Sequence, residues 1–310
     1  MNLPGLHHIT AVASNPRGNL AYYTGVLGLR LVKLTVNFDD PSAYHFYFAD
    51  AHGTPGSALT FFHWGGARRG RTGHGQTSAI AFAVGADSLP FWAERLKTLG
   101  ATVAAPVERF GERVLAFTDP DGLPLELVAT AAPAAVYFPP KHDEIPAAHR
   151  LRGFHSVTLA LDRGDATREL LTATMGWSVT ATAEGRTRLA SSAGAAGGFV
   201  DLLVDRALPR GVPGAGTVHH IAFRTPDDAA QLNARRELIT ARMHASPVME
   251  RFYFRSIYWR EPEGILFEIA TDQPGFTADE PVESLGTKLC LPPPLEPHRA
   301  EIEAALPPLS

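Results

Sequence analysis

Two pairs of adjacent histidines, more than 200 residues apart, are the most informative chemical feature of the sequence. His7 and His8 lie in the segment LHHIT, and His219 and His220 lie in VHHIAF. Glu268 lies inside the apolar segment EGILFEIA, where an unpaired carboxylate would be costly to bury. Two neutral imidazoles and one carboxylate are a common ligand set for non-haem Fe(II), and Zn²⁺ also accepts them. These residues indicate a metal site, although their spacing does not distinguish the two metals.

The two-residue period of a β-strand predicts which of these side chains share a face. His8 alternates with Ile9, and His220 alternates with Ile221. Glu268 lies on the face opposite the isoleucines and the phenylalanine of its own segment. If the apolar faces pack on helices, His8, His220 and Glu268 all point into the concavity of a curved sheet.

A third histidine segment offers an alternative ligand. His155 lies in the segment GFHSVT, which aligns with GLHHIT so that Ser156 takes the place of His8. Ala79 occupies the corresponding place in another strand and cannot bind a metal, so Glu126 has no imidazole partners in its register. A one-residue slip of the strand would return His155 to the ligand face, which leaves open whether His155 or His8 completes the site. Structural roles are expected for most of four further histidines: His45, His52, His63 and His74.

A fourfold repeat supplies the elements that must position these residues. Alternating segments predict strands at 5–12, 76–84, 153–161 and 218–225. Each strand leads into a predicted helix, at 16–27, 87–99, 165–175 and 227–242. Gly28, Gly100 and Gly176 follow the first three helices, where a C-cap favours a positive φ. Further strands follow each helix, so we expect an α+β fold of four βαβββ modules that form two curved-sheet domains.

Internal similarity also predicts how the chain is divided. The segments 119–128 and 261–270 align without gaps and pair Glu126 with Glu268. We expect an N-terminal domain of two modules at 1–130, a linker at 131–152 and a C-terminal domain of two modules at 153–272. A proline-rich tail at 273–310 is expected to contain a short helix near 296–306.

Composition excludes several classes of protein. The 310 residues include 28 Lys and Arg against 32 Asp and Glu, a net charge of −4, so the basic footprint of a nucleic-acid-binding protein is missing. A hydrophobic content of 45% suits a globular protein, and no apolar run is long enough to predict a membrane span. The single cysteine, Cys290, cannot form an internal disulfide or build a cysteine metal site. We therefore expect a reducing compartment and a cytoplasmic protein.

Taken in order, the motifs of nearly the whole chain resemble the vicinal oxygen chelate superfamily, which includes glyoxalases, extradiol dioxygenases and bleomycin-resistance proteins. The resemblance is closest to the hydroquinone-type ring-cleaving dioxygenases of that superfamily. It rests on LHHIT, RLVKLTVNFDD, YHFYFAD with a following GTPG, ERFGER, RGFHS, VHHIAF, SIYWREPEGILFE and ESLGTKLCLP.

The resemblance implies a ligand set made by a His of the first module and a His and a Glu of the fourth. By motif position these ligands are His8, His220 and Glu268, which strand parity also selects. Strand parity places the other histidine of each pair, His7 and His219, on the face that points towards the helices. Side chains on that face would not contact the substrate directly. Arg251 lies where the motif varies. The implied supporting residues are His7, Thr10, His219, Arg251 and Tyr258.

The implied activity is cleavage of a small aromatic diol, of the hydroquinone or catechol kind, by O₂. The implied cofactor is Fe(II), with Mn(II) and Zn(II) as alternatives. Tyr258 and either His7 or His219 would hydrogen-bond the substrate oxygens or transfer protons. Assembly into a homo-oligomer is compatible with the resemblance, and neither a nucleic acid nor a membrane is an expected partner.

The sequence is also compatible with two other functions. A glyoxalase-like metal-dependent isomerase or lyase usually takes a fourth protein ligand from the strand at 57–63. The cleft positions of that strand are Thr60 and Phe62, and neither is a carboxylate. A non-catalytic protein that binds small molecules or drugs would need no metal, and the presence of both histidines and the glutamate argues against it.

Overall fold

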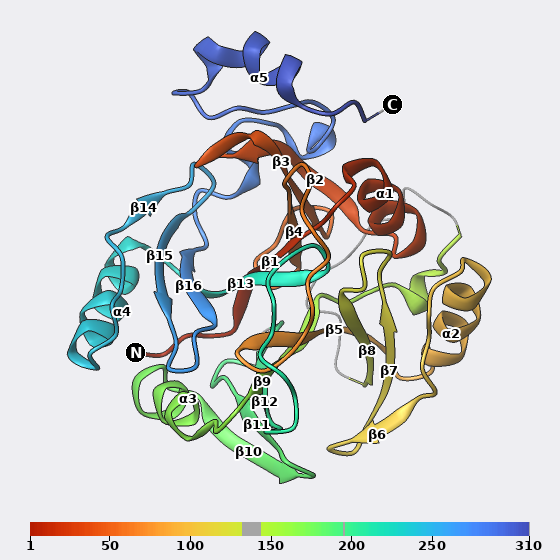
Figure 1. Ribbon diagram of the computed structural model, residues 1–310, viewed down its shortest axis with the longest axis vertical. Helices are drawn as coiled ribbons and strands as arrows, with labels where there is room; N and C mark the ends of the chain where they lie inside the picture. The colour runs from red at the N-terminus through yellow and green to blue at the C-terminus, as the bar shows by residue number, and fades with distance from the viewer. Residues whose placement is uncertain (132–143, 195, 310) are drawn as a thin grey trace.

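A computed structural model describes residues 1–131, 144–194 and 196–309 and confirms four βαβββ modules (Figure 1). Most of the predicted linker at 131–152 lies outside the described residues, and the rest contains one helical turn, Ala147–His149. Within the described part of the chain, no helix has the length and hydropathy needed to cross a membrane.

Each module has one strand, a helix and three further strands. Module 1 comprises β1 (Leu6–Val12), α1 (Pro16–Ala21), β2 (Arg30–Asn37), β3 (Asp40–Ala49) and β4 (Ala58–His63). Module 2 comprises β5 (Gln76–Gly85), α2 (Leu89–Thr98), β6 (Val107–Arg109), β7 (Glu112–Thr118) and β8 (Pro124–Thr130). Module 3 comprises β9 (Phe154–Leu161), α3 (Asp165–Glu169), β10 (Ser178–Ala183), β11 (Arg186–Ala190) and β12 (Phe199–Val204). Module 4 comprises β13 (Thr217–Thr225), α4 (Asp228–Thr240), β14 (Met249–Glu250), β15 (Arg255–Arg260) and β16 (Leu266–Thr271).

The modules form two eight-stranded sheets, and each sheet combines one module from the N-terminal half of the chain with one from the C-terminal half. Sheet 1 contains modules 1 and 4 in the order β14-β15-β16-β13-β1-β4-β3-β2. Sheet 2 contains modules 2 and 3 in the order β10-β11-β12-β9-β5-β8-β7-β6. Antiparallel pairing of β1 with β13, and of β5 with β9, joins the modules at the centre of each sheet. The division into domains at 1–130 and 153–272 stays a prediction.

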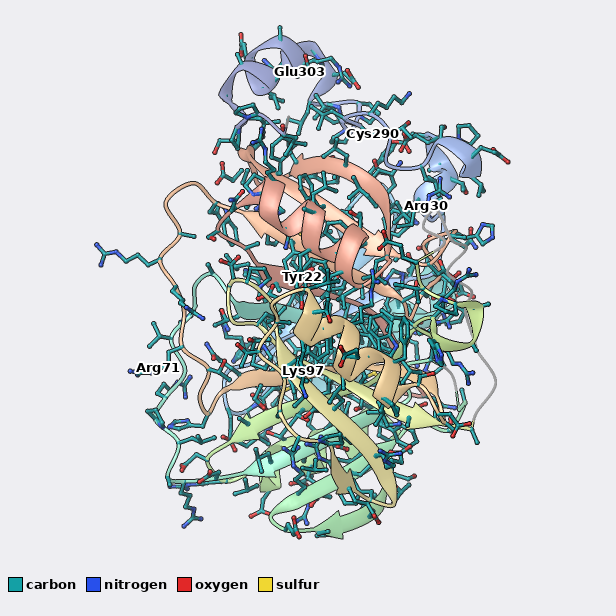
Figure 2. All side chains as sticks on the ribbon, turned by 90° about the vertical axis from the view of Figure 1, so that its right-hand side faces the viewer. Tyr22, Arg30, Arg71, Lys97, Cys290 and Glu303 are labelled. Atoms are coloured by element: carbon teal, nitrogen blue, oxygen red, sulfur yellow. The ribbon has the colours of Figure 1, made fainter. Side chains whose placement is uncertain are left out.

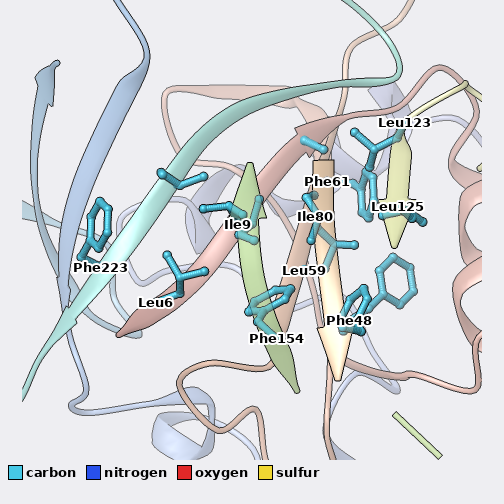
Figure 3. Packing of buried hydrophobic residues seen from close by; sticks show 14 of the residues in the cluster. Leu6, Ile9, Phe48, Leu59, Phe61, Ile80, Leu123, Leu125, Phe154 and Phe223 are labelled. Atoms are coloured by element: carbon cyan, nitrogen blue, oxygen red, sulfur yellow. The ribbon is translucent and has the colours of Figure 1, made fainter. Parts of the chain in front are cut away.

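The core lies largely between the two sheets. Ile9 and Phe223 of sheet 1 belong to the same buried cluster as Ile80, Leu125 and Phe154 of sheet 2 (Figure 3). The apolar strand faces pack on the module helices as expected, since Trp92 of α2 and Leu238 of α4 belong to this cluster, and the central strands also pack on the opposite sheet. The helices α1 to α4 lie around the outside of the sheets (Figure 1). The opposite face of each central strand is therefore the one that points into a concavity.

Local sequence sets the helix boundaries. Asn15 caps α1 and Asp227 caps α4, and each side chain accepts a hydrogen bond from the first turn of its helix. Short π-helical turns, Tyr22–Val26 and Leu170–Thr174, continue α1 and α3 to the predicted ends. The glycines that follow the first three helices have φ of 70°, 83° and 78°, as predicted for Gly28, Gly100 and Gly176.

The C-terminal tail packs against β2 and β3 at the module 1 end of the molecule (Figure 2, near Cys290 and Glu303). The fully buried Lys33 of β2 forms ion pairs with Asp279 and Glu280 of the tail, and its ammonium lies over the ring of Tyr253. Burying a charge is costly unless it is paired, so these contacts hold the tail in place. The predicted helix near 296–306 is confirmed as α5 (Arg299–Ala305), preceded by the turn Glu296–His298.

Asp119 connects module 1 to module 2. Its carboxylate accepts hydrogen bonds from the Tyr23 hydroxyl at 3.0 Å and from the Leu123 backbone at 2.8 Å. Burial raises the pKa of Asp119 to about 6, although both hydrogen bonds act in the opposite direction. The folded state therefore favours the protonated form relative to the unfolded state.

We predict that Asp119 makes the protein more stable at pH 5 than at pH 7. Because its folded pKa is raised, its stabilisation is complete below the unfolded value of 3.8 and is lost as the pH rises through about 6. Urea unfolding would measure the free energy of unfolding at both pH values. The increase in this free energy from pH 7 to pH 5 should be smaller by about 1 kcal/mol in Asp119→Asn than in the wild type. An equal gain in the variant and the wild type would contradict the prediction.

Candidate metal centre

Three central strands of sheet 1 bring His8, His220 and Glu268 together. The strand β1 carries His8, the neighbouring β13 carries His220, and β16 beyond it carries Glu268. All three side chains are buried. The Nε2 atoms of His8 and His220 are 3.3 Å apart and lie 3.4 Å and 3.0 Å from Glu268 Oε2. Module 1 and module 4 thus both contribute to one cluster.

These three atoms suit a divalent metal ion. Ligands about 2.1 Å from one ion and at right angles to each other lie about 3 Å apart, which matches this cluster. Glu268 Oε2 is buried and has no hydrogen-bond partner, whereas Ser256 donates to the other oxygen, Oε1. A buried oxygen without a partner is costly, and a metal would satisfy it. The donor set of two imidazoles and one carboxylate therefore fits the ion that the sequence predicts.

Two β-bulges place the neighbouring histidines. In the pairing of β1 with β13, the register skips His7 on one strand and His219 on the other. The Nδ1 atoms of His7 and His8 are 2.9 Å apart, and those of His219 and His220 are 2.8 Å apart. Simple strand parity placed His7 and His219 on the helix side, but His219 lines the same pocket as the cluster. His7 lines a separate pocket of about 320 Å³ with Tyr253 and Asp272.

Burial keeps the supporting imidazoles neutral. Burial lowers the pKa of His219 to about 3 and holds the pKa of His7 well below its usual range. The pKa of His220 is also lowered by burial, although Glu268 opposes the effect. For Glu268 burial raises the pKa, but His8 and His220 outweigh burial and hold the value well below its usual range. Glu268 therefore offers an ionised carboxylate, as metal binding requires.

A pocket of about 410 Å³ opens directly on the cluster. This volume lies within the usual range for sites that bind small molecules. Its walls are largely aromatic and include residues of the β2–β3 turn and of the segment after β14. The residues of the pocket wall beyond the cluster include Asn37, Phe38, Asp39, Asp40, His45, Tyr47, Phe62, Trp64, His219, Arg251, Phe254, Tyr258 and Leu266.

Two of the predicted supporting residues, Arg251 and Tyr258, line this pocket together. Arg251 Nε donates to the Tyr258 hydroxyl at 3.3 Å, and the guanidinium lies over the tyrosine ring. Tyr258 also lies beside Glu268 in the pairing of β15 with β16. Burial, and then the charge of Glu268, raise the pKa of Tyr258, so its phenol stays protonated at neutral pH.

Thr10, another of the five predicted supporting residues, does not line the pocket. Its buried hydroxyl lies 2.7 Å from Thr60 Oγ1, which in turn lies 2.9 Å from His45 Nε2. His45 does line the pocket, so Thr10 reaches the pocket through two hydrogen bonds.

Comparison with known proteins agrees with this geometry. Residues 5–127 match the model of the Glyoxalase/Bleomycin resistance protein/Dioxygenase superfamily. The "Putative ring-cleaving dioxygenase MhqO" of Bacillus subtilis is 44% identical over 97% of this chain and 95% of its own length. The chain belongs to this superfamily.

Two further relatives are similar over nearly their whole length. The chlorohydroquinone/hydroquinone 1,2-dioxygenase of Sphingobium indicum is 33% identical over 97% of both chains. A crystal structure described as a "putative dioxygenase" from Bacillus subtilis is 43% identical, with a TM-score of 0.94 over 100% of this chain and 98% of that one. The resemblance of the motifs to ring-cleaving dioxygenases is thus confirmed at the level of the family.

Sheet 2 of this superfamily member has no equivalent metal cluster among its described residues. Ser156 and Ala79 take the positions of the two ligand histidines, as the sequence predicted. Glu126, the counterpart of Glu268, forms two hydrogen bonds with Arg109, at 2.8 Å and 3.0 Å. His155 bonds to Glu112 at 3.0 Å, within sheet 2. The alternative in which His155 replaces His8 is therefore wrong.

One other group of potential ligands is present among the described residues, formed by Asp279, Glu280 and Cys290. The buried ammonium of Lys33 already pairs with both carboxylates of this group. The tail cluster is therefore explained as a buried ion pair rather than a metal site.

Sequence reasoning missed three residues at the centre. Ser256 bonds to Glu268, His45 was expected to be structural, and Asp39 forms an ion pair with Arg251. The alternation of RSIYWR places Ser256 and Tyr258 on one face, opposite Ile257, and this pattern could have identified Ser256. The partnership of Asp39 and Arg251 spans more than 200 residues and had no local signal.

We predict that Ser256→Ala lowers metal affinity about tenfold, because the carboxylate of Glu268 loses the hydrogen bond that fixes its orientation. Metal affinity would be measured by competition with a chelator. Ser156→Ala is the matched control, since it removes a buried hydroxyl from sheet 2. Equal losses in the two variants would contradict a specific effect on the metal centre.

Proposed function

We propose that this protein is an Fe(II)-dependent ring-cleaving dioxygenase that acts on a hydroquinone- or catechol-like diol with O₂. The observation that carries the proposal is a buried His8, His220 and Glu268 cluster that opens on an aromatic pocket. Similarity over the full length to a chlorohydroquinone/hydroquinone 1,2-dioxygenase supports the same reaction class. Bound Fe(II) would lower the pKa of a coordinated phenol and supply the redox chemistry that activates O₂.

His7 and His219 fix the tautomers of the ligand histidines. When His8 and His220 present Nε2 to a metal in the neutral form, each carries its proton on Nδ1. The Nδ1 of His8 then donates to His7, and the Nδ1 of His220 donates to His219. Such partners orient a ligand imidazole and increase its basicity. We assign both histidines this positioning role, and the neutral His219 also faces the substrate pocket.

Tyr258 is the residue we assign to the substrate oxygens. Its hydroxyl accepts a hydrogen bond from Arg251, which leaves its own proton available to donate. Because the raised pKa keeps the phenol neutral, Tyr258 can hydrogen-bond an ionised substrate oxygen without charge repulsion. Arg251 has a positioning role here, because its bond holds the Tyr258 hydroxyl in place.

Thr10 and Thr60 orient His45 within the pocket wall. The two hydroxyls and the imidazole form a continuous hydrogen-bonded chain. Burial holds the pKa of His45 well below its usual range, so the ring is neutral. We assign Thr10 a positioning role, because it acts on the pocket through Thr60 and His45.

The two alternative functions have less support. A glyoxalase-like site would take a fourth ligand from β4, but the Thr60 hydroxyl is hydrogen-bonded to Thr10 and His45, and Phe62 is aromatic. A protein that only binds small molecules would not need a glutamate buried beside two histidines. It would also not explain why the Oε2 atom of Glu268 is buried without a hydrogen-bond partner. The three-ligand centre leaves positions open for both a diol and O₂.

We predict that Glu268→Gln and His220→Ala each lower the turnover of hydroquinones or catechols at least about 100-fold and weaken metal retention, since each loses a ligand. O₂ consumption after anaerobic Fe(II) loading would measure turnover, and elemental analysis would measure the metal. Glu126→Gln, which changes the equivalent glutamate of sheet 2, should retain the metal. Full activity of either ligand variant would overturn the assignment.

We further predict that Fe(II) restores O₂-dependent ring cleavage to the metal-free protein, whereas Zn(II) binds without restoring it, because Zn(II) has no redox chemistry. Products of diol cleavage would be identified by mass spectrometry for each metal, with Mn(II) as a third arm. Isomerisation of a thiol adduct by the Zn(II) form would instead favour the glyoxalase alternative.

A further inference from the structure

We propose that Asp39 makes the pocket selective for uncharged aromatic diols, because it neutralises Arg251 and so denies carboxylated rings their counter-ion. The inference rests on the proposed function, since it concerns the substrate of the same site. It assigns Asp39 the role of a specificity-determining residue.

Asp39 and Tyr258 together contact all three nitrogens of the Arg251 guanidinium. Arg251 Nη1 donates to Asp39 Oδ1 at 3.1 Å, and Nη2 lies 2.9 Å from Oδ2. The remaining nitrogen, Nε, donates to Tyr258. A carboxylated ligand would contact the same two terminal nitrogens of the guanidinium. Asp39 therefore occupies the place of a ligand carboxylate.

Separate parts of the chain hold the two partners in the pocket wall. Asp39 lies in the turn between β2 and β3, where its backbone N–H donates to the side chain of Asn37 at 3.0 Å. Arg251 follows β14 of module 4, and its side chain is only 18% exposed, against 67% for Asp39. The Asp39 carboxylate is thus exposed to solvent, whereas the Arg251 guanidinium lies deeper in the pocket wall.

The other charges of the pocket also disfavour an anion. Arg251 is the only lysine or arginine that lines it among the described residues, whereas Asp39 and Asp40 are acidic. The uncharged wall is formed largely by Phe38, Tyr47, Phe62, Trp64, Phe254 and Leu266. Apolar and aromatic surface of this kind suits rings with hydrogen, halogen or alkyl substituents, because burying an unpaired carboxylate there is costly.

The test compares benzene-1,4-diol with 2,5-dihydroxybenzoate, which is the same diol with one carboxylate. Anaerobic calorimetric titration of the Fe(II)-loaded protein measures binding without turnover. Wild type should bind the uncharged diol at least about tenfold more tightly than the carboxylated one. Asp39→Asn should tighten binding of the carboxylated diol about tenfold, since it frees Arg251, and change binding of the uncharged diol less than about threefold.

Asp40→Asn is the matched control, because it removes the same charge from the adjacent residue, whose carboxylate bonds to Trp64 instead. The affinity of Asp40→Asn for the carboxylated diol should increase less than about threefold over that of the wild type. Equal gains in the two variants, no gain in Asp39→Asn, or failure of wild type to bind or to distinguish the diols would each overturn the inference. Binding of benzene-1,4-diol without O₂ consumption would contradict the proposed function and leave this selectivity intact.

Discussion

The antiparallel pairing of β1 with β13 is the interaction on which the candidate site depends. This pairing joins module 1 to module 4, so it brings together histidines that are more than 200 residues apart. The two bulges in the pairing turn each neighbouring histidine so that it contacts the ligand histidine beside it. A regular ladder would have placed the members of each pair on opposite faces. The two candidate ligand histidines and the histidines that contact them therefore all result from one irregular strand junction.

The same junction recurs in sheet 2 with different side chains. The pairing of β5 with β9 skips Ser78 and His155, at positions equivalent to the skipped histidines of sheet 1. Among the residues that the structure describes, its concavity contains ion pairs instead of a metal cluster, with Glu126 bonded to Arg109 and Arg188 bonded to Asp201. One backbone design thus supports either a metal centre or a paired-charge core, because buried charge can be satisfied by an ion or by an arginine.

Much of the fold followed from local patterns. Alternating segments and glycine caps predicted four βαβββ modules, and all four are present because each pattern acts within a few residues of the chain. The pairing of modules 1 and 4 in one sheet was not predicted, since the family resemblance implied only that these two modules share the metal site. Packing of Ile9 and Phe223 on the opposite sheet was not expected at all, since an apolar strand face does not specify which surface covers it.

For the site, the sequence by itself determined the ligand set. The parity of three short strands placed His8, His220 and Glu268 on one side, because side-chain alternation is a property of each strand alone. Only the tertiary structure decided what surrounds them. The bulges that turn His7 and His219, the bond from Ser256 and the pairing of Arg251 with Asp39 all depend on how separate strands meet. Such contacts are set by register and packing between distant segments, which local periodicity does not encode.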